Sequence, residues 1–124
     1  MAKKILIVED NEVNRVLMRD LLAYHGYEII EAADGAEGIQ KAKKVRPDLI
    51  LMDIQMPIMD GIQAITHLKA DPETRDLKIV GITSFAMKGD RERILQAGCD
   101  EYVAKPINTR ELPKLVKRLL GEEA

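Results

Sequence analysis

The sequence predicts an α/β fold in which helices cover both faces of a parallel sheet. Five short runs of mainly β-branched and aliphatic residues alternate with longer segments whose apolar residues recur at helical spacing. Such alternation is typical of parallel strands joined by crossover helices. The chain has 124 residues, enough for one core of ordinary size, and no segment resembles a linker. We therefore expect residues 1–124 to form a single domain with no output domain attached.

Local signals place the strands and the first two helices. Strands are expected near residues 4–8, 28–32, 48–53, 78–83 and 101–104. The first helix is expected from about residue 12 to 25, because Gly26 is a typical helix stop. Its buried face is expected to carry the apolar residues Val13, Val16, Leu17, Leu21 and Tyr24. The second helix is expected over about 35–45, because Pro47 pushes Arg46 out of helical geometry.

The sequence signals for the three later helices differ in strength. The third follows the turn at 60–61, after which apolar residues recur at helical spacing. The fourth, between residues 87 and 97, has few apolar anchors and is expected to be the least firmly packed. The last buries apolar residues between 112 and 120. Pro113 lies in its first turns, so this helix is expected to start irregularly or bend.

Composition and charge exclude several classes of function. Lys and Arg total 19 against 21 Asp and Glu, a net charge of -2, so no sequence-wide basic field favours nucleic acid or anionic lipid. No apolar run approaches a membrane span, and the run after Lys3 and Lys4 is too brief for a signal peptide. Cys99 is the only cysteine, which agrees with a reducing compartment and excludes a paired-thiol zinc site. We therefore expect a cytoplasmic protein.

Four of the expected strands end in polar residues that could act together in one site. Glu9 and Asp10 follow the first strand, and Asp53, Thr83 and Lys105 come at the ends of the third, fourth and fifth. Because the carboxyl ends of parallel strands meet at one edge of a sheet, these residues are expected to converge. The result is an acidic pocket that also holds a lysine and a hydroxyl.

Such a pocket suits a divalent cation and a phosphoryl group. Neighbouring carboxylates repel one another, which favours a bound cation, and Mg²⁺ prefers hard oxygen ligands and keeps several waters. Asp10, Asp53 and a backbone carbonyl would suffice as protein ligands, with Glu9 acting through a coordinated water. Asp53 can then attack a phosphoryl donor in line, while Mg²⁺, Lys105 and Thr83 stabilise charge on the equatorial oxygens. The product is an aspartyl phosphate.

Each of these residues also has an ordinary explanation when taken alone. Asp10 can cap the first helix, Thr83 can fill a strand end, and Lys105 can be a solvated surface lysine. Their joint placement at successive strand ends favours a functional site.

Five segments resemble response-regulator receiver domains. They are residues 7–11, 48–57, 59–61, Thr83 with Ala86 and Met87, and 102–106. Five motifs in the family order, on the expected elements, make this resemblance specific, and it spans essentially the whole chain. It is strongest to free-standing receivers, so it implies a two-component response regulator rather than a metabolic enzyme.

The resemblance implies a role for each residue of the pocket. Asp53 is the implied phosphoacceptor, and the implied Mg²⁺ ligands are Glu9, Asp10, Asp53 and the carbonyl of Gln55. Thr83 and Lys105 are expected to contact the phosphoryl group. The implied fold is a flavodoxin-like, doubly wound sheet of five strands in the order 2-1-3-4-5, flanked by five helices. A cis bond between Lys105 and Pro106 is also implied.

The resemblance further implies how phosphorylation is read out. The phosphoryl group is implied to draw Thr83 inward, and Tyr102 to turn in behind it. Taken alone, Tyr102 is interpreted as an aromatic residue at the edge of the core. Gln55 and Phe85 are expected to flank the path of a hydrolytic water, and we hypothesise that the bulky Phe85 slows loss of the phosphate. The surface of the fourth helix, fifth strand and fifth helix is the implied partner face.

The implied partners are proteins. A histidine kinase or a histidine phosphotransfer protein would supply the phosphoryl group, docking mainly around the first helix, and a downstream protein target would read the signal. No nucleic acid or membrane partner is expected, and the chain is expected to be a monomer or weak dimer.

Three alternatives stay open from the residues. A Mg²⁺-dependent phosphohydrolase would need an acid or base carboxylate where Gln55 stands and a substrate cap that the sequence lacks. A nucleotide-binding domain is disfavoured because the first strand-to-helix turn, 9–12, is acidic rather than glycine-rich. A binding module that works without phosphorylation would keep the fold but would not need the intact acceptor site.

Overall fold

Five strands alternate with five helices along the chain. The computed structural model describes residues 2–56, 59–84 and 88–122, with the backbone alone described for 88–90. The strands are β1 (Lys4–Val8), β2 (Glu28–Ala32), β3 (Leu49–Asp53), β4 (Ile79–Thr83) and β5 (Glu101–Ala104). The helices are α1 (Glu12–Tyr24), α2 (Gly35–Val45), α3 (Gly61–Ala70), α4 (Lys88–Gln96) and α5 (Glu111–Leu119). The expected elements are therefore all present.

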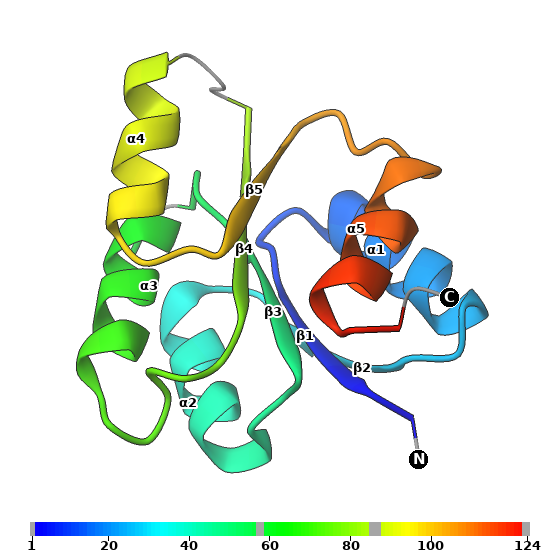
Figure 1. Ribbon diagram of the computed structural model, residues 1–124, viewed down its shortest axis with the longest axis horizontal. Coiled ribbons are helices and arrows are strands. Elements are labelled where there is room, and N and C mark those ends of the chain that lie inside the picture. Colours follow the sequence, from blue (N-terminus) through cyan, green and yellow to red (C-terminus); the bar gives the residue numbers. More distant parts are fainter. Residues whose placement is uncertain (1, 57–58, 85–87, 123–124) are drawn as a thin grey trace.

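The strands form one parallel sheet in the order β2-β1-β3-β4-β5. Helices α1 and α5 cover one face, and α2, α3 and α4 cover the other (Figure 1). This confirms the doubly wound fold with the expected strand order. In such a sheet the crevice at the carboxyl ends of β1 and β3, where the order reverses, is the usual place for a ligand site.

The sheet separates two apolar cores. Successive residues of a strand point to opposite faces. Leu6 and Val8 therefore pack toward α2 and α3 with Ala42 and Leu68, whereas Ile5 and Ile7 pack toward α1 and α5 with Met18, Leu22 and Val116. All five residues of β3 and of β4 are buried. The strands that end in Asp53 and Thr83 are thus held rigidly from both sides.

The buried face of α1 differs from the expected one. Val13, Leu17 and Tyr24 were expected inside, but their exposed fractions are 77%, 43% and 86%. Met18 and Leu22 are the residues that α1 buries completely. Apolar residues occupy a wide arc of this helix, so helical spacing alone does not define which part of the arc meets the sheet. The structure leaves an apolar stripe of α1 on the surface.

Polar caps fix where the helices next to the site begin. Asn11 accepts a hydrogen bond from the Asn14 N–H at the start of α1. Asp60 accepts one from the Gln63 N–H, and the Gln63 side chain accepts one from the Asp60 N–H, which is a capping box. Both helices begin at the carboxyl edge of the sheet, so these caps hold the loops that follow β1 and β3.

The irregular end expected for α2 is found, and Pro113 lies in the first turn of α5 as expected. Arg46 ends α2 in the left-handed region, at φ 51°, directly before Pro47. Pro113 is the third residue of α5, where the missing N–H costs no helical hydrogen bond. The side chain of Arg110 does not cap this helix. The side-chain oxygen of Asn108 instead accepts hydrogen bonds from the backbone N–H groups of Arg110 and Glu111.

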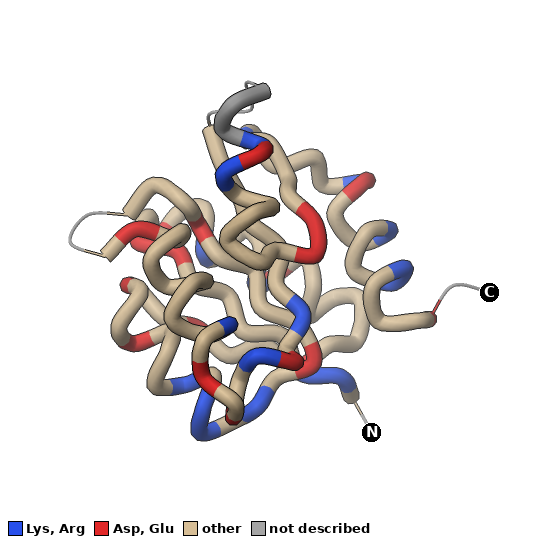
Figure 2. The backbone as a smooth tube through the Cα atoms, turned by 60° about the vertical axis from the view of Figure 1, so that its left-hand side comes forward, with Lys and Arg blue, Asp and Glu red and all other residues tan. Residues whose placement is uncertain are grey.

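Helix α4 is weakly anchored, as expected. Among its described side chains, residues 91–96, Ile94 is the one that is buried. Figure 2 shows that basic and acidic residues are interspersed over the side of the molecule formed by α2, α3 and α4. Over the described residues, no helix combines the length and the apolar character that crossing a bilayer requires.

Candidate functional site

Four strand ends bring the predicted residues into one pocket. The Lys105 ammonium lies 3.1 Å from Glu9 Oε1 and 3.2 Å from Asp53 Oδ1, so one cation serves two carboxyl groups. Glu9 is fully buried and Asp53 is 1% exposed, whereas the Lys105 side chain is 17% exposed. The bond between Lys105 and Pro106 is cis, as expected. The convergence predicted from the strand ends is therefore what the structure shows.

The acidic groups are arranged as a cation would require. Glu9, Asp10 and Asp53 each offer an oxygen, and these oxygens lie within 4.8 Å of one another. Oε2 of Glu9 and Oδ2 of Asp53 are buried without a hydrogen-bond partner among the described residues, whereas Oε1 of Glu9 faces the Lys105 ammonium. Buried polar atoms are rarely left unpaired unless a ligand, ion or water satisfies them. Hard oxygen donors of this kind fit Mg²⁺ better than softer metals.

The two buried carboxyl groups have unequal proton affinities. Burial raises the pKa of Asp53 well above its ordinary value, and the neighbouring Glu9 carboxyl raises it further. Burial alone would also raise the pKa of Glu9, but its contacts with Asp53 and Lys105 outweigh burial and lower it. The same carboxyl groups raise the pKa of Lys105 despite its partial burial. Without a metal, Asp53 is therefore the carboxyl group that takes up a proton more readily, and Glu9 is the one that more readily keeps its charge beside Lys105.

Thr83 is fully buried beside the pocket and is held by Gln55. The Gln55 side-chain nitrogen donates to Thr83 Oγ1 at 2.7 Å, and its side-chain oxygen accepts from the Ser84 N–H at 2.8 Å. The Gln55 backbone N–H donates to Asp53 Oδ1 at 3.1 Å. Sequence reasoning assigned Gln55 a carbonyl ligand and a place beside the hydrolytic water. It missed these side-chain contacts, for which the spacing of the residues gives no signal.

Arg15, on the first helix, makes two contacts beside the site that sequence reasoning did not predict. Its Nη1 donates to the Glu9 backbone oxygen at 2.9 Å, and its Nε is paired with Glu31 Oε1 at 3.2 Å. Arg15 thus links the backbone of Glu9, at the end of β1, to Glu31 in β2. An arginine on the first turn of a helix is common, so the sequence alone does not single it out.

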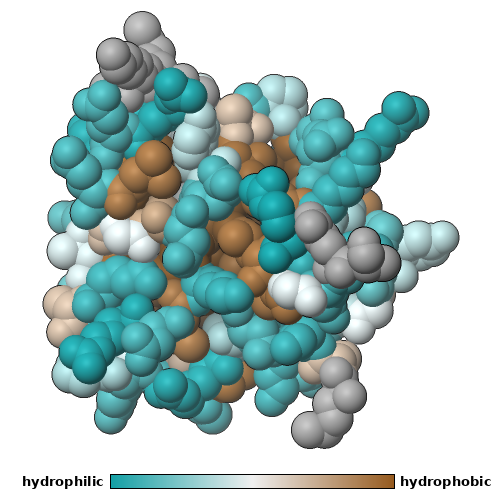
Figure 3. Space-filling view, viewed as in Figure 1, coloured by the Kyte–Doolittle hydropathy of each residue, from teal (hydrophilic) through white to brown (hydrophobic). Residues whose placement is uncertain are grey.

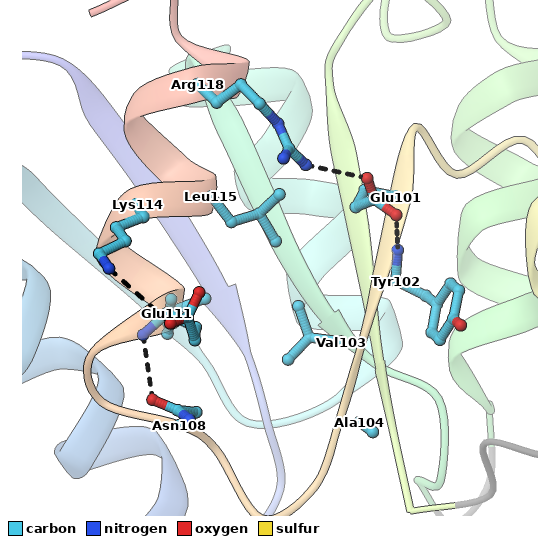
Figure 4. A pocket seen from close by; sticks show the side chains of 10 residues that line it. Glu101, Tyr102, Val103, Ala104, Asn108, Glu111, Lys114, Leu115 and Arg118 are labelled. Carbon is cyan, nitrogen blue, oxygen red and sulfur yellow. Dashed lines mark hydrogen bonds and ion pairs between the residues drawn. The ribbon is translucent and has the colours of Figure 1, made fainter. Parts of the chain in front are cut away.

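Tyr102 lies on the side of β5 that faces α4. Its hydroxyl accepts from Arg91 Nη1 at 2.8 Å, and the Arg91 guanidinium carbon lies 5.7 Å from the ring centroid. In Figure 4 its ring points away from Val103 and Leu115. Tyr102 is therefore in contact with α4 through Arg91. Phe85, the other residue expected to tune the phosphate lifetime, lies outside the described residues.

Comparisons with known proteins agree with this geometry. The sequence matches the family described as the response regulator receiver domain over residues 5–117. The polar-differentiation response regulator DivK of Brucella anthropi is 47% identical over 122 residues, covering 98% of this chain and 99% of that protein.

Solved structures show the same fold. The receiver domain of the sensor histidine kinase PA1611 of Pseudomonas aeruginosa, with a magnesium ion coordinated in its active-site cleft, is 38% identical with a TM-score of 0.90; the match covers 98% of this chain and 99% of that one. Chemotaxis protein CheY4 of Vibrio cholerae is 28% identical with a TM-score of 0.91, covering 96% and 99% of the two chains. The chain therefore belongs to the response-regulator receiver family, whose members act in two-component signalling and not as metabolic enzymes.

Proposed function

We propose that Asp53 accepts a phosphoryl group from a phosphohistidine donor in a Mg²⁺-dependent reaction. The observation that carries this proposal is the buried Asp53 carboxyl, whose Oδ2 has no hydrogen-bond partner among the described residues and whose Oδ1 lies 3.2 Å from the Lys105 ammonium. A carboxylate that is poorly satisfied and desolvated is a better nucleophile than a solvated one. The chain would thereby catalyse its own phosphorylation.

Each residue of the pocket has a defined part in this transfer. An oxygen of Asp53 forms the new bond to phosphorus, while the bond from phosphorus to the donor imidazole breaks and its electron pair stays on the nitrogen. Lys105 and the Thr83 hydroxyl stabilise charge on the equatorial oxygens. Mg²⁺, held by Glu9, Asp10, Asp53 and the Gln55 carbonyl, would neutralise the negative charge that gathers in the pocket. A proton held by Asp53 would pass to solvent when a cation is bound.

Loss of the phosphate would be a second reaction of the same site. We propose that a water attacks the phosphorus of the aspartyl phosphate past Gln55 and Phe85. The bond from phosphorus to the Asp53 oxygen breaks, the carboxylate is restored and inorganic phosphate leaves, so that the side chains at these two positions set the lifetime. The position of Gln55 between Asp53 and Thr83 supports this role.

The donor would dock on α1. Val13, Leu17 and Tyr24 are exposed on this helix, which starts beside Glu9 and Asp10. Exposed apolar residues that gather on one helix face are a common feature of protein-binding surfaces. A histidine kinase or histidine phosphotransfer protein seated there would bring its phosphoimidazole to the pocket.

The downstream target would bind the face formed by α4, β5 and α5. A groove between β5 and α5 is lined by apolar residues, among them Val103 and Leu115, and by charged residues, among them Glu101 and Arg118 (Figure 4). Apolar atoms show between polar side chains at the centre of this face (Figure 3). Tyr102 borders the same groove, so a switch at Thr83 would reach this surface. We propose that residues 1–124 signal as one receiver domain in the cytoplasm, as a monomer or weak dimer, through protein contacts.

Incubation with Mg²⁺ and acetyl phosphate or phosphoramidate tests the proposal. The intact mass is expected to show one added phosphoryl group, and this adduct should be lost in Asp53→Asn and in a chelated sample. A wild-type protein that gains no phosphoryl group, even when sampled early, would favour a binding module that works without phosphorylation.

A further inference from the structure

The loop that carries two of the proposed Mg²⁺ ligands is bonded at two points to Arg15. Glu9 follows the last residue of β1, and its backbone N–H donates to the Ala32 oxygen at 3.0 Å. The Glu9 backbone oxygen accepts from Arg15 Nη1 at 2.9 Å. The Arg15 backbone N–H donates to the Asn11 oxygen, also at 2.9 Å. Arg15 therefore contacts the residue before Asp10 and the residue after it.

Glu31 holds the Arg15 side chain in this orientation. Arg15 Nε lies 3.2 Å from Glu31 Oε1, and the other oxygen of Glu31 lies 3.3 Å from Arg19 Nη1. A guanidinium is planar and presents its donors in a fixed fork, so a partner at Nε determines where Nη1 points. Glu31 thus directs Arg15 at the Glu9 oxygen. Arg19 shares Glu31, but its Nε bonds to the neighbouring Asp20.

The position of this loop matters because Mg²⁺ tolerates little displacement of its ligands. The ion demands near-octahedral geometry at short distances to oxygen. Glu9, Asp10 and Asp53 each offer one oxygen to the cation site. Asp53 ends a fully buried strand, whereas Asp10 is exposed in the loop between β1 and α1. The backbone bonds of this loop therefore help to determine where two of the three acidic groups lie.

We propose that Arg15 is a positioning residue for the Mg²⁺ site. It fixes the peptide unit between Glu9 and Asp10, and it acts on the cation only through that backbone. The inference rests on the proposed Mg²⁺ site and adds a residue that is not one of the proposed ligands.

The charge of Arg15 makes the proposal testable by the sign of one effect. A positive charge beside the site repels a cation, so its removal alone would strengthen Mg²⁺ binding. Loss of positioning would weaken the binding instead. A weaker affinity in a variant that has lost a positive charge is therefore specific to positioning.

Titration with MgCl₂, without a phosphoryl donor, measures this affinity. The amide NMR signals of Asp10 and Asn11 report binding. Arg15→Met keeps an unbranched stem but removes the guanidinium, and we expect its Kd for Mg²⁺ to rise about tenfold, as is typical when a group that orients metal ligands is lost. Arg19→Met is the matched control, because it removes the same charge and a contact with Glu31 from the same helix. It should not weaken Mg²⁺ binding.

A second variant and a metal-free measurement support the comparison. Arg15→Lys keeps the charge but loses the planar fork, so it should also weaken Mg²⁺ binding, by less than Arg15→Met. In metal-free buffer the Glu9 N–H, which donates to Ala32, should exchange faster with solvent in Arg15→Met than in wild type. Both readouts use proteins whose unfolding curves show that they are folded.

Phosphorylation by acetyl phosphate separates metal binding from chemistry. In Arg15→Met the Mg²⁺ concentration that gives half the maximal rate should rise in step with the Kd, and saturating Mg²⁺ should restore most of the rate. A lower maximal rate at an unchanged Mg²⁺ midpoint would overturn the inference. So would unchanged or tighter Mg²⁺ binding in Arg15→Met, wild-type binding in Arg15→Lys, an equal weakening in Arg19→Met, or unchanged Glu9 exchange.

Failure of the proposed function would give different results. A wild-type protein that binds no Mg²⁺ would overturn the Mg²⁺ site itself, and the role of Arg15 with it. A wild-type protein that binds Mg²⁺ but takes up no phosphoryl group would overturn the phosphoacceptor, while the binding comparison would still decide the role of Arg15.

Discussion

Replacing Lys105 by methionine is expected to cost both activity and stability. The Lys105 ammonium lies within 3.2 Å of oxygens on Glu9 and Asp53, and neither carboxyl group is exposed. Without it, the site loses the ammonium group that would stabilise the equatorial oxygens of a transferring phosphoryl group. The rate of phosphorylation by acetyl phosphate at saturating Mg²⁺ should fall on the order of 10²-fold.

The loss of stability in Lys105→Met should depend on pH in a defined direction. In the unfolded chain both carboxyl groups titrate near pH ~4. In the folded variant, burial and mutual repulsion raise the pKa of both, so above pH ~4 the folded state binds more protons than the unfolded state. The free energy of unfolding then falls as pH rises through this window. In metal-free buffer we expect a cost of about 3 kcal/mol near pH 8 and a much smaller one near pH 5.

Two comparisons make this prediction specific. Adding Asp53→Asn to Lys105→Met removes one of the two repelling charges and should restore much of the lost stability. Lys44→Met, at an exposed position on α2, should change neither the rate nor the unfolding curve. Equal losses of stability at both pH values would show that the cost of losing Lys105 is packing rather than charge.

Replacing Gly61 by alanine is expected to destabilise the fold and to displace the backbone of Asp53. Gly61 is the first residue of α3, and its N–H donates to the Ile54 oxygen at 3.0 Å. A Cβ added there would lie 2.3 Å from the Asp53 backbone oxygen and 2.7 Å from Ile54 Cα. Backbone atoms cannot yield as a flexible side chain can, so α3 and the end of β3 must move apart. We expect a loss of about 3 kcal/mol in the free energy of unfolding by urea.

The same displacement should slow the chemistry in the fraction that remains folded. A shift of the Asp53 backbone moves the nucleophile relative to Lys105 and Thr83, so the phosphorylation rate should fall by at least about tenfold. Gly35→Ala is the matched control, because Gly35 is the first residue of α2 and its added Cβ would approach Met59 no closer than 3.1 Å. Similar effects of the two substitutions would contradict the account of Gly61.

Much of the site could be predicted because the geometry of a parallel sheet determines it. Once five strands alternate with helices, the residues after each strand must meet at one edge, and this brings Glu9, Asp53, Thr83 and Lys105 together. The strand order came from the family resemblance, since the alternation of elements alone allows other orders. The predicted buried face of α1 was wrong at Val13, Leu17 and Tyr24, because the apolar arc of this helix is wider than the surface it buries.

The contacts that could not be predicted are individual side-chain hydrogen bonds between one element and another. Gln55 reaches Thr83 across 28 residues, and the Arg15 side chain reaches the Glu9 backbone by folding back toward β1. Arg91 on α4 reaches Tyr102 on β5. Each contact depends on a rotamer choice in the folded protein, and neither periodicity nor spacing in the sequence encodes that choice.

The most direct measurement of the central claim is chemical trapping of the phosphorylated residue. The protein would be phosphorylated with phosphoramidate and Mg²⁺, treated with borohydride, which reduces an acyl phosphate to an alcohol, and mapped by peptide mass spectrometry. Phosphorylation at the buried carboxyl predicts conversion of Asp53 to homoserine, with Glu9 and Asp10 unchanged. Reduction at Glu9 or Asp10, or a phosphoryl group that resists borohydride, would contradict it.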